Sequence, residues 1–248
     1  MNICYCSNIN GIKLLKVSMT SIEKHNQNIN FHIIHSDLED RHFTELRDLV
    51  VSNIVFYKIK QKDFRDFIGA YDEKKSYIPV EKFLRFFIPK FLSVNKVLYL
   101  DIDTLVRDNI EALYNTILSN YSVAAVPWYR VSSSKLRKLN MKIEPIYFNS
   151  GVILIDLKKI KENNLFEIAT KMYLDNPTRY AGDQDVLNEL LNGNYLKLDS
   201  IFNYTPSTER DFKFRQDAKI VHFAGEYKPF YCFLPKLYKK EFKHIYKE

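Results

Sequence analysis

Lys96-Val97-Leu98-Tyr99-Leu100-Asp101-Ile102-Asp103-Thr104-Leu105-Val106 is the stretch of sequence that decides the fold. Four apolar residues run without a break into two carboxylates, a pattern that predicts a strand buried on both faces. Asp101 and Asp103 are two residues apart, so in an extended chain they share one side, with Cα atoms roughly 6–7 Å apart. Open α/β sheets bind ligands at the carboxyl ends of their strands, and a like-charged pair there needs a positive partner such as a divalent metal ion. Alternatively, the two acids cap the next helix or face water.

The composition is that of a globular protein rich in basic groups. With 248 residues, 46% of them hydrophobic, the chain can form one large α/β domain or two small ones. A formal net charge of +7 favours anionic partners, which include phosphorylated substrates, an anionic membrane face and nucleic acid. The three cysteines form no CxxC pair, so a reducing compartment is expected. The N-terminus lacks a signal-peptide pattern, and polar residues interrupt the longest uncharged stretch, residues 112–129, which therefore predicts no membrane span.

Short apolar strands alternate with amphipathic helices ahead of the central stretch. The patterns predict, in order, a strand over residues 3–6, a helix over 14–25, a strand over 30–35, a helix over 43–50 and a strand over 53–59. This rhythm is typical of a doubly wound, mostly parallel sheet flanked by helices. A nucleotide typically binds such a sheet at the loop after its first strand, where Asn8 and Asn10 lie. These two residues are either nucleotide ligands or turn formers.

Polar residues interrupt several apolar segments further along the chain. Arg85, on a helix predicted over residues 81–91, could pair with a carboxylate or a phosphate, or form a surface salt bridge. The basic, Ser-rich segment 131–142 is expected to be a mobile loop, and residues 157–174 are expected to form one amphipathic helix. Asn149-Ser150-Gly151 lies inside an apolar strand, which indicates a bulge or the close approach of a ligand to the backbone.

The last third of the chain carries the remaining candidates. Asp183-Gln184-Asp185 opens a helix, with acids at its positive end. His222 lies in a short strand and is either a metal ligand or a structural residue. Lys228, beyond Gly225, could meet a phosphate as a point charge. Residues 234–248 form a basic amphipathic segment that either docks as a C-terminal helix or lies on an anionic membrane surface.

Taken together, these stretches resemble the retaining glycosyltransferases of family 8, the group of the bacterial lipopolysaccharide galactosyl- and glucosyltransferases and of glycogenin. The resemblance covers nearly the whole chain. It rests on four motifs in the family's order: residues 97–106, Tyr147-Phe148-Asn149-Ser150-Gly151-Val152, Asp183-Gln184-Asp185-Val186-Leu187-Asn188, and His222-Phe223-Ala224-Gly225 with Lys228-Pro229-Phe230. It implies an α/β fold of the glycosyltransferase A type, with a mostly parallel nucleotide-binding sheet in a single domain, residues 1–233, followed by the tail 234–248.

The resemblance also implies a role for each candidate residue. A Mn²⁺ ion, or alternatively Mg²⁺, would bind the diphosphate of a UDP-sugar and would itself be held by Asp101, Asp103 and His222. The nucleoside would be gripped by Asn8, Asn10 and Ile102. The phosphates would be met by Gly225 and Lys228. The nucleotide-sugar would further contact Arg85, Asn149, Ser150, Asp183 and Gln184.

The implied activity is metal-dependent, retaining transfer of galactose or glucose from a UDP-sugar to a saccharide or glycolipid acceptor. The implied setting is lipopolysaccharide or surface-glycan synthesis, in the cytoplasm or peripherally at the cytoplasmic face of the membrane. Gln184 and Asp183 are the catalytic candidates, and because an amide is a weak nucleophile, Gln184 is expected to position the sugar or stabilise its cation. Two positions depart from the family: Asn8 replaces an acid but can still bind uracil, and Trp128 replaces an acid that helps to bind sugar.

Two other classes of protein compete with this interpretation. A phosphatase of the haloacid-dehalogenase type also carries Asp-x-Asp-x-Thr after an apolar strand, and Asp101 would then be its nucleophile. That motif normally comes early in the chain, and the alternative leaves Asn149-Ser150-Gly151 and residues 222–230 unexplained. A nucleic-acid binder would suit the positive charge, but the sequence carries no recognised groove-reading or single-strand motif, so no nucleic-acid partner is expected.

Overall fold

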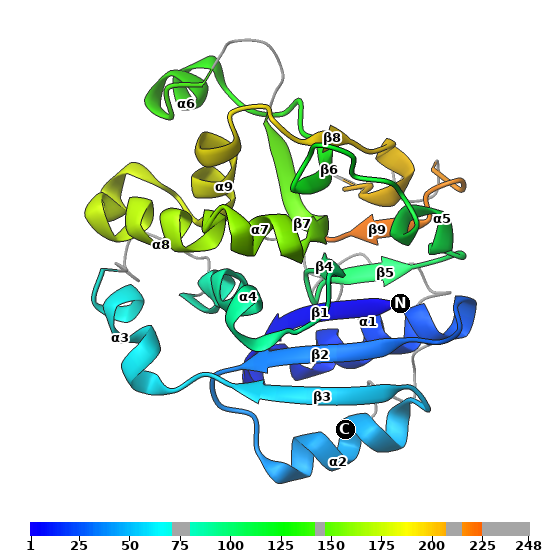
Figure 1. Ribbon diagram of the computed structural model, residues 1–248. Helices are drawn as coiled ribbons and strands as arrows, with labels where there is room; N and C mark the ends of the chain where they lie inside the picture. The colour runs from blue at the N-terminus through cyan, green and yellow to red at the C-terminus, as the bar shows by residue number, and fades with distance from the viewer. Residues whose placement is uncertain (71–79, 142–146, 207–214, 225–248) are drawn as a thin grey trace.

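A seven-stranded sheet in the order β3-β2-β1-β4-β7-β6-β8 forms the centre of the computed structural model (Figure 1). The structure describes residues 1–70, 80–141, 147–206 and 215–224. The strands of this sheet are β1 Asn2–Ser7, β2 Asn30–His35, β3 Asn53–Lys58, β4 Lys96–Leu100, β6 Val123–Pro127, β7 Phe148–Asp156 and β8 Leu196–Lys197. Two short strands, β5 Thr104–Val106 and β9 Ile220–His222, pair antiparallel beside it.

Helices flank the sheet, as the alternation of strands and helices predicts (Figure 1). The α-helices are α1 Ile12–His25, α2 Asp40–Leu49, α3 Gln61–Ala70, α4 Ile88–Phe91, α5 Glu111–Tyr114, α6 Ser133–Lys138, α7 Leu157–Glu162, α8 Leu165–Asp175 and α9 Asp183–Leu191. The 3₁₀ helices are η1 Ile9–Gly11, η2 Val80–Phe87, η3 Pro177–Arg179 and η4 Ser200–Phe202. Among the described residues, none of these helices has the length and apolar character needed to cross a bilayer.

Strand β4 is buried on both faces, as its sequence predicts. Val97 and Tyr99 pack into one hydrophobic cluster, and Leu98 and Leu100 pack into another, because successive side chains of a strand point to opposite faces. β4 runs parallel to β1, and β1 and β2 continue the parallel pairing to β3. The fold is therefore a mostly parallel sheet with a core on each side.

Strand β7 runs antiparallel to both of its neighbours, β4 and β6, and is the exception to the parallel pattern. Leu100 pairs with Val152, so the amino end of β7 lies beside the carboxyl end of β4. This reversal brings residues 149–151 next to the carboxylates that follow β4. The pairing of β6 with β7 shifts register between Ala125, which pairs with Ile153, and Pro127, which pairs with Phe148. Two steps along β6 therefore face five steps along β7, so the irregularity lies in β7 and includes Asn149-Ser150-Gly151, where a bulge was one of the two alternatives.

Two segments differ from the elements that their sequence predicts. Residues 131–142 were expected to be a loop, but they contain α6, because the Ser132 hydroxyl caps the Lys135 N–H and Leu136 is buried. The single helix expected over 157–174 is two helices, since Asn164 adopts a left-handed backbone conformation between α7 and α8. Most of the helix expected over 81–91 is 3₁₀, with α4 as its last turn.

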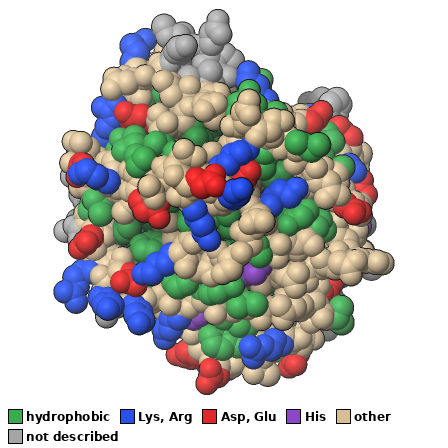
Figure 2. All heavy atoms as spheres, viewed as in Figure 1, with side chains coloured by type: hydrophobic (Ala, Val, Ile, Leu, Met, Phe, Trp, Pro, Cys, Tyr) green, Lys and Arg blue, Asp and Glu red, His purple; other side chains and the backbone are tan. Residues whose placement is uncertain are grey.

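Part of the predicted C-terminal region lies outside the described residues. This applies to Gly225, Lys228 and the tail 234–248. On the face shown in Figure 2, Lys and Arg side chains are interspersed with Asp and Glu, and basic groups gather along the lower left edge. The domain boundary after residue 233 stays a prediction.

Candidate active site

The chain turns sharply after the carboxyl end of β4, and hydrogen bonds within the turn and to neighbouring elements hold it in place. The Asp101 N–H donates to the Gly151 carbonyl at 2.8 Å, which continues the pairing with β7 past the end of β4. The Thr104 hydroxyl donates to the Asp101 carbonyl at 2.8 Å and contacts the Ser18 hydroxyl of α1 at 2.9 Å. Thr104 then begins β5 and pairs with His222 in β9. The turn and the β5-β9 pair thus bring the histidine to the two acids.

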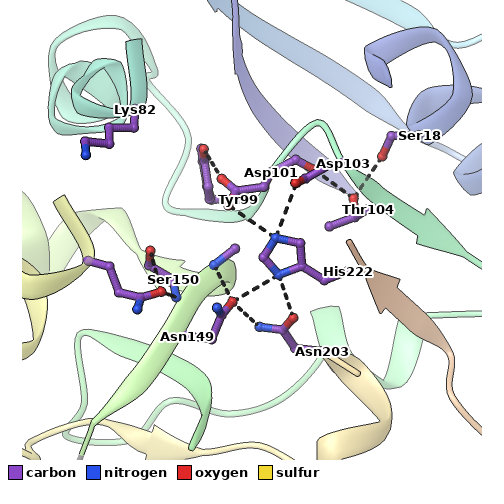
Figure 3. Close-up of polar contacts among 12 residues, drawn as sticks. Ser18, Lys82, Tyr99, Asp101, Asp103, Thr104, Asn149, Ser150, Asn203 and His222 are labelled. Carbon is purple, nitrogen blue, oxygen red and sulfur yellow. Dashed lines mark hydrogen bonds and ion pairs between the residues drawn. The ribbon is translucent and has the colours of Figure 1, made fainter. Parts of the chain in front are cut away.

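Asp101, Asp103 and His222 form a compact cluster, as predicted (Figure 3). One ligand atom from each residue lies within 4.8 Å of the others. The His222 Nε2 lies 3.3 Å from Asp103 Oδ1 and 3.5 Å from Asp101 Oδ2. Asp103 and His222 are buried, and Asp101 is partly exposed, so the cluster opens to solvent on the side of Asp101. Two carboxylates and one imidazole are a donor set that suits a divalent cation such as manganese.

The other side of the His222 ring also faces oxygen atoms. Its Nδ1 lies 3.1 Å from Asn149 Oδ1 and 3.0 Å from Asn203 Oδ1 (Figure 3). A neutral imidazole has only one N–H, so it cannot satisfy amide oxygens on one side and carboxylates on the other. A cation between Nε2 and the carboxylates removes this conflict. The residues present therefore fit a metal ion at this position.

Gly151 is required by the close approach of His222 to the backbone of β7. A Cβ atom at this position would overlap the imidazole, with Cε1 as its nearest atom. The polar interruption in the sequence thus coincides with the irregular register of β7 and with a close approach to the backbone, but the approaching group is a side chain of the protein itself.

Replacing Gly151 with Ala is expected to destabilise the protein by about 1–3 kcal/mol, the usual cost of overpacking a buried site. The same substitution in a His222→Ala background is expected to cost much less, because the atoms that clash are gone. Urea denaturation of the four proteins in this double-mutant cycle measures the difference. Equal destabilisation in both backgrounds would contradict the proposed clash.

Arg85 is a buried ion-pair residue, so of its three alternatives the pairing with a carboxylate is confirmed and the surface salt bridge is wrong. Its guanidinium lies 2.8 Å from Asp101 Oδ1 and donates to the Ser150 carbonyl at 2.7 Å. Its Nε is 2.8 Å from Asp183 Oδ2, close enough for an ion pair although not aligned as a hydrogen bond. Arg85 therefore joins β4, β7 and α9 at the candidate site. The Tyr99 hydroxyl adds a hydrogen bond to Asp101 at 2.7 Å.

Asp183 is a buried carboxylate at the start of α9. Burial raises the pKa of Asp183, and the positive charges of Arg85 and the nearby Lys82 oppose this shift. One guanidinium is shared between Asp101 and Asp183, so it offsets at most one negative charge. With Asp103 included, the site carries an excess of negative charge that a divalent cation would neutralise.

Both the oxygen and the nitrogen of the Gln184 side-chain amide form hydrogen bonds. Its Oε1 accepts from the Ser150 N–H at 2.9 Å, and its Nε2 donates to the Tyr147 hydroxyl at 3.1 Å. The Tyr147 hydroxyl in turn donates to Asp185, which also forms a 2.7 Å ion pair with Lys135 of α6. Tyr147 and Lys135 were not predicted as site residues, because their partners come from elements that are distant in sequence.

The loop after β1 packs against the Asp101–Asp103 turn. Asn8 accepts a hydrogen bond from the Gly11 N–H at 3.1 Å and so caps η1, which confirms its role as a turn former. Asn10 is exposed. A Cβ on Gly11 would overlap the Ile102 side chain, so this loop and Ile102 are neighbours. Whether Asn8, Asn10 and Ile102 bind a nucleotide stays a prediction.

Trp128 directly follows β6 and packs, partly buried, against the hydrophobic core. The Arg130 guanidinium lies 5.7 Å from the centre of the Trp128 ring. The exposed part of the Trp128 ring thus lies beside the positive charge of Arg130.

The mostly parallel α/β sheet, with two carboxylates and a histidine gathered beyond its central strand, matches the A type of glycosyltransferase fold. The chain matches the family model for Glycosyl transferase family 8 over residues 2–231 and belongs to this family. The resemblance inferred from the four sequence motifs is thereby confirmed. The match does not support the phosphatase alternative.

Curated relatives and a solved structure agree with this assignment. The chain is 28% identical to a putative glycosyltransferase of Haemophilus influenzae, over 99% of this chain and 75% of that protein. It is 30% identical to the lipopolysaccharide 1,2-glucosyltransferase of Escherichia coli, over 93% of this chain and 73% of that protein. Another curated relative is longer, and the chain spans about half of it. The crystal structure of the galactosyltransferase LgtC, with donor and acceptor sugar analogues, has the same fold, with a TM-score of 0.85 and 24% identity over 99% of this chain and 95% of LgtC.

Proposed function

We propose that this enzyme transfers galactose or glucose from a UDP-sugar to a saccharide acceptor, with retention of anomeric configuration. The observation that carries the proposal is the convergence of Asp101, Asp103 and His222 in a family 8 glycosyltransferase. These residues would hold Mn²⁺, with Mg²⁺ as a weaker alternative, because imidazole favours manganese over magnesium. The bound metal would supply positive charge for the diphosphate leaving group.

The buried polar groups beside this cluster support a sugar site. The Oδ2 atom of Asp183 is buried without an aligned hydrogen bond among the described residues, so it retains the capacity to accept one from a sugar hydroxyl. Arg85 holds Asp183 and Asp101 in a fixed relation, which would orient the donor sugar relative to its diphosphate. Asn149 and Ser150 belong to the same site, and we propose that the phosphates are also met by Gly225 and Lys228.

Gln184 is proposed to position the donor sugar and to stabilise positive charge at its anomeric carbon, where an oxocarbenium-like state develops. Its Oε1 accepts from the Ser150 backbone, which occupies the atom that a nucleophilic role would need. Trapping of a sugar covalently bound to Gln184 under slow turnover would contradict this role.

Replacing Tyr147 with Phe is expected to lower kcat by about 10–100-fold with little change in the donor KM. The substitution removes the hydroxyl that holds Gln184 Nε2 and joins it to Asp185, so Gln184 would lose its fixed orientation. Steady-state assays of UDP release measure both constants. Tyr195→Phe is the matched control, since the buried Tyr195 hydroxyl has no hydrogen-bond partner in the described part of the chain. Equal effects of the two substitutions would contradict the positioning of Gln184 by Tyr147.

The proposed acceptor is a glycan or glycolipid assembled in the cytoplasm or at the cytoplasmic face of the membrane. The support is the similarity to a lipopolysaccharide glucosyltransferase and the net charge of +7, which suits an anionic surface. The basic tail 234–248 would contribute most to a peripheral membrane contact.

One assay tests the proposed function directly. Purified protein is incubated with Mn²⁺ and a panel of UDP-sugars, and the release of UDP is measured. We expect turnover of UDP-galactose or UDP-glucose that depends on the added metal. Release of inorganic phosphate from a phosphomonoester without any UDP-sugar turnover, or no reaction with any donor, would overturn the proposal.

A further inference from the structure

We infer that Asn203 is a positioning residue that fixes the orientation and the protonated nitrogen of His222. The inference rests on the proposed metal site and adds to it a residue that no sequence motif indicates. Asn203 follows η4 and is buried, with its side-chain amide against His222 and Asn149 (Figure 3). Its two side-chain contacts, together with the hydrogen bond from the Gly151 N–H to Asn149, specify which nitrogen of the ring carries the proton.

The chain of contacts begins at a backbone N–H, which can only donate. The Gly151 N–H points at the side chain of Asn149 with an N···O distance of 3.0 Å. The atom of Asn149 at this position must therefore be its oxygen, Oδ1. The orientation of the Asn149 amide is thus decided by the main chain of β7.

The orientation of Asn203 follows from that of Asn149. The end of the Asn203 amide that lies 2.8 Å from Asn149 Oδ1 must donate, so it is the Nδ2 group. The opposite end, Oδ1, then faces His222 Nδ1 at 3.0 Å. Since Asn149 Oδ1 also lies 3.1 Å from Nδ1, two oxygens surround this nitrogen. Nδ1 therefore carries the proton, and the lone pair of Nε2 is directed at Asp101 and Asp103.

The backbone that follows Asn203 is hydrogen-bonded to β9, the strand that carries His222. The Tyr204 N–H donates to the Ile220 carbonyl at 2.9 Å, and the His222 N–H donates to the Tyr204 carbonyl at 2.8 Å. The backbone after Asn203 is therefore paired with β9 on both sides of Val221. Asn203 and His222 are held in a fixed relation, so the amide can orient the ring before any cation binds.

Mn²⁺ affinity tests the inference without recourse to activity. Free Mn²⁺ is measured by electron paramagnetic resonance while the ion alone is titrated into the protein. We expect Asn203→Leu to weaken Mn²⁺ binding by about 10–100-fold, the usual effect of removing a group that holds a ligating histidine. Asn203→Asp, which retains an oxygen acceptor for Nδ1–H, is expected to bind Mn²⁺ more tightly than Asn203→Leu. Asn203→Ala removes the same oxygen with no added bulk and is measured alongside as a second variant.

A buried asparagine far from the site supplies the control. Asn26 is buried at the C-terminal end of α1 and makes two hydrogen bonds to the backbone, so Asn26→Leu is expected to lower stability without changing Mn²⁺ affinity. Nitrogen modulation in the pulsed spectrum of bound Mn²⁺ reports ligation by histidine, and we expect it to weaken in Asn203→Leu but not in Asn26→Leu.

Two outcomes overturn the inference, and they are distinguishable. If the unsubstituted protein binds no Mn²⁺, or binds it as well after His222→Ala, the proposed metal site fails and the role of Asn203 fails with it. If Mn²⁺ binding depends on His222 but is equally tight in Asn203→Leu, Asn203→Ala and the unsubstituted protein, the metal site stands and the inference about Asn203 alone is overturned.

Discussion

Asp103→Asn is expected to reduce turnover of the UDP-sugar donor on the order of 10³-fold, which corresponds to about 4 kcal/mol in activation free energy. The amide has the shape of the carboxylate but lacks its charge. Asp103 is buried and lies 3.3 Å from His222 Nε2, so its replacement removes one of the two negative charges that the proposed cation contacts. The substitution also relieves repulsion between Asp101 and Asp103, so the protein is expected to remain folded.

The measurement is UDP release with saturating Mn²⁺, together with direct titration of Mn²⁺. Asp108→Asn is the matched control, because Asp108 lies a few residues further along the chain, is exposed, and pairs only with Lys219 among the salt bridges of the described residues. We expect the control to retain full activity. Unchanged turnover in Asp103→Asn would remove the proposed role of this carboxylate in metal binding.

Arg85→Met is expected to lower the free energy of unfolding by about 3–5 kcal/mol. Arg85 is buried, and its loss would leave the buried Asp183 without its closest cation and the Ser150 carbonyl without its donor. A protein of this kind has a total stability of about 5–15 kcal/mol, so the loss is a large part of the whole. Activity is expected to fall as well, because the same guanidinium holds Asp101.

Urea denaturation followed by circular dichroism measures the effect. Arg179→Met is the matched control, since Arg179 makes a bidentate ion pair with Glu189 at 2.7 and 2.9 Å but is partly exposed. This partly exposed pair is expected to contribute no more than about 1 kcal/mol. Arg85→Lys keeps the charge but cannot span three partners, so an intermediate loss is expected. Similar losses for Arg85→Met and Arg179→Met would contradict a special role for Arg85.

Local patterns were sufficient to predict most of the parallel half of the sheet. Strands β1 to β4 are short apolar runs, and their intervening helices have apolar residues at helical spacing, so local sequence and burial agree there. The prediction was wrong where a single backbone conformation or cap decides the element. Asn164 breaks the helix after β7, and Ser132 begins α6 within a segment that composition alone describes as a loop.

The candidate site was predicted in part. Asp101, Asp103 and His222 were predicted to meet and do so, and Arg85 was predicted to pair with a carboxylate as one of three alternatives. Tyr147 and Asn203 were missed as site residues, because a tyrosine or an asparagine carries no signal for function unless its neighbours in space are known. The role of Asn149 beside the donor sugar stays a prediction, and the structure adds that its oxygen contacts Gly151, Asn203 and His222.

The sequence by itself determined that Asp101 and Asp103 follow a buried strand and that the protein belongs to an α/β class. The extended chain expected for these two acids is wrong, because the chain turns there and the Thr104 N–H donates to the Asp101 carbonyl at 3.2 Å. It also determined the family, because four motifs occur in the right order. Only the tertiary structure decided which residues join Asp101 and Asp103 to complete the candidate metal site. The reversed strand β7 brings Gly151 under the His222 ring, and the pairing of β5 with β9 brings that ring to the carboxylates. These contacts join residues that are 50 to 120 positions apart, a separation that local propensity and periodicity do not encode.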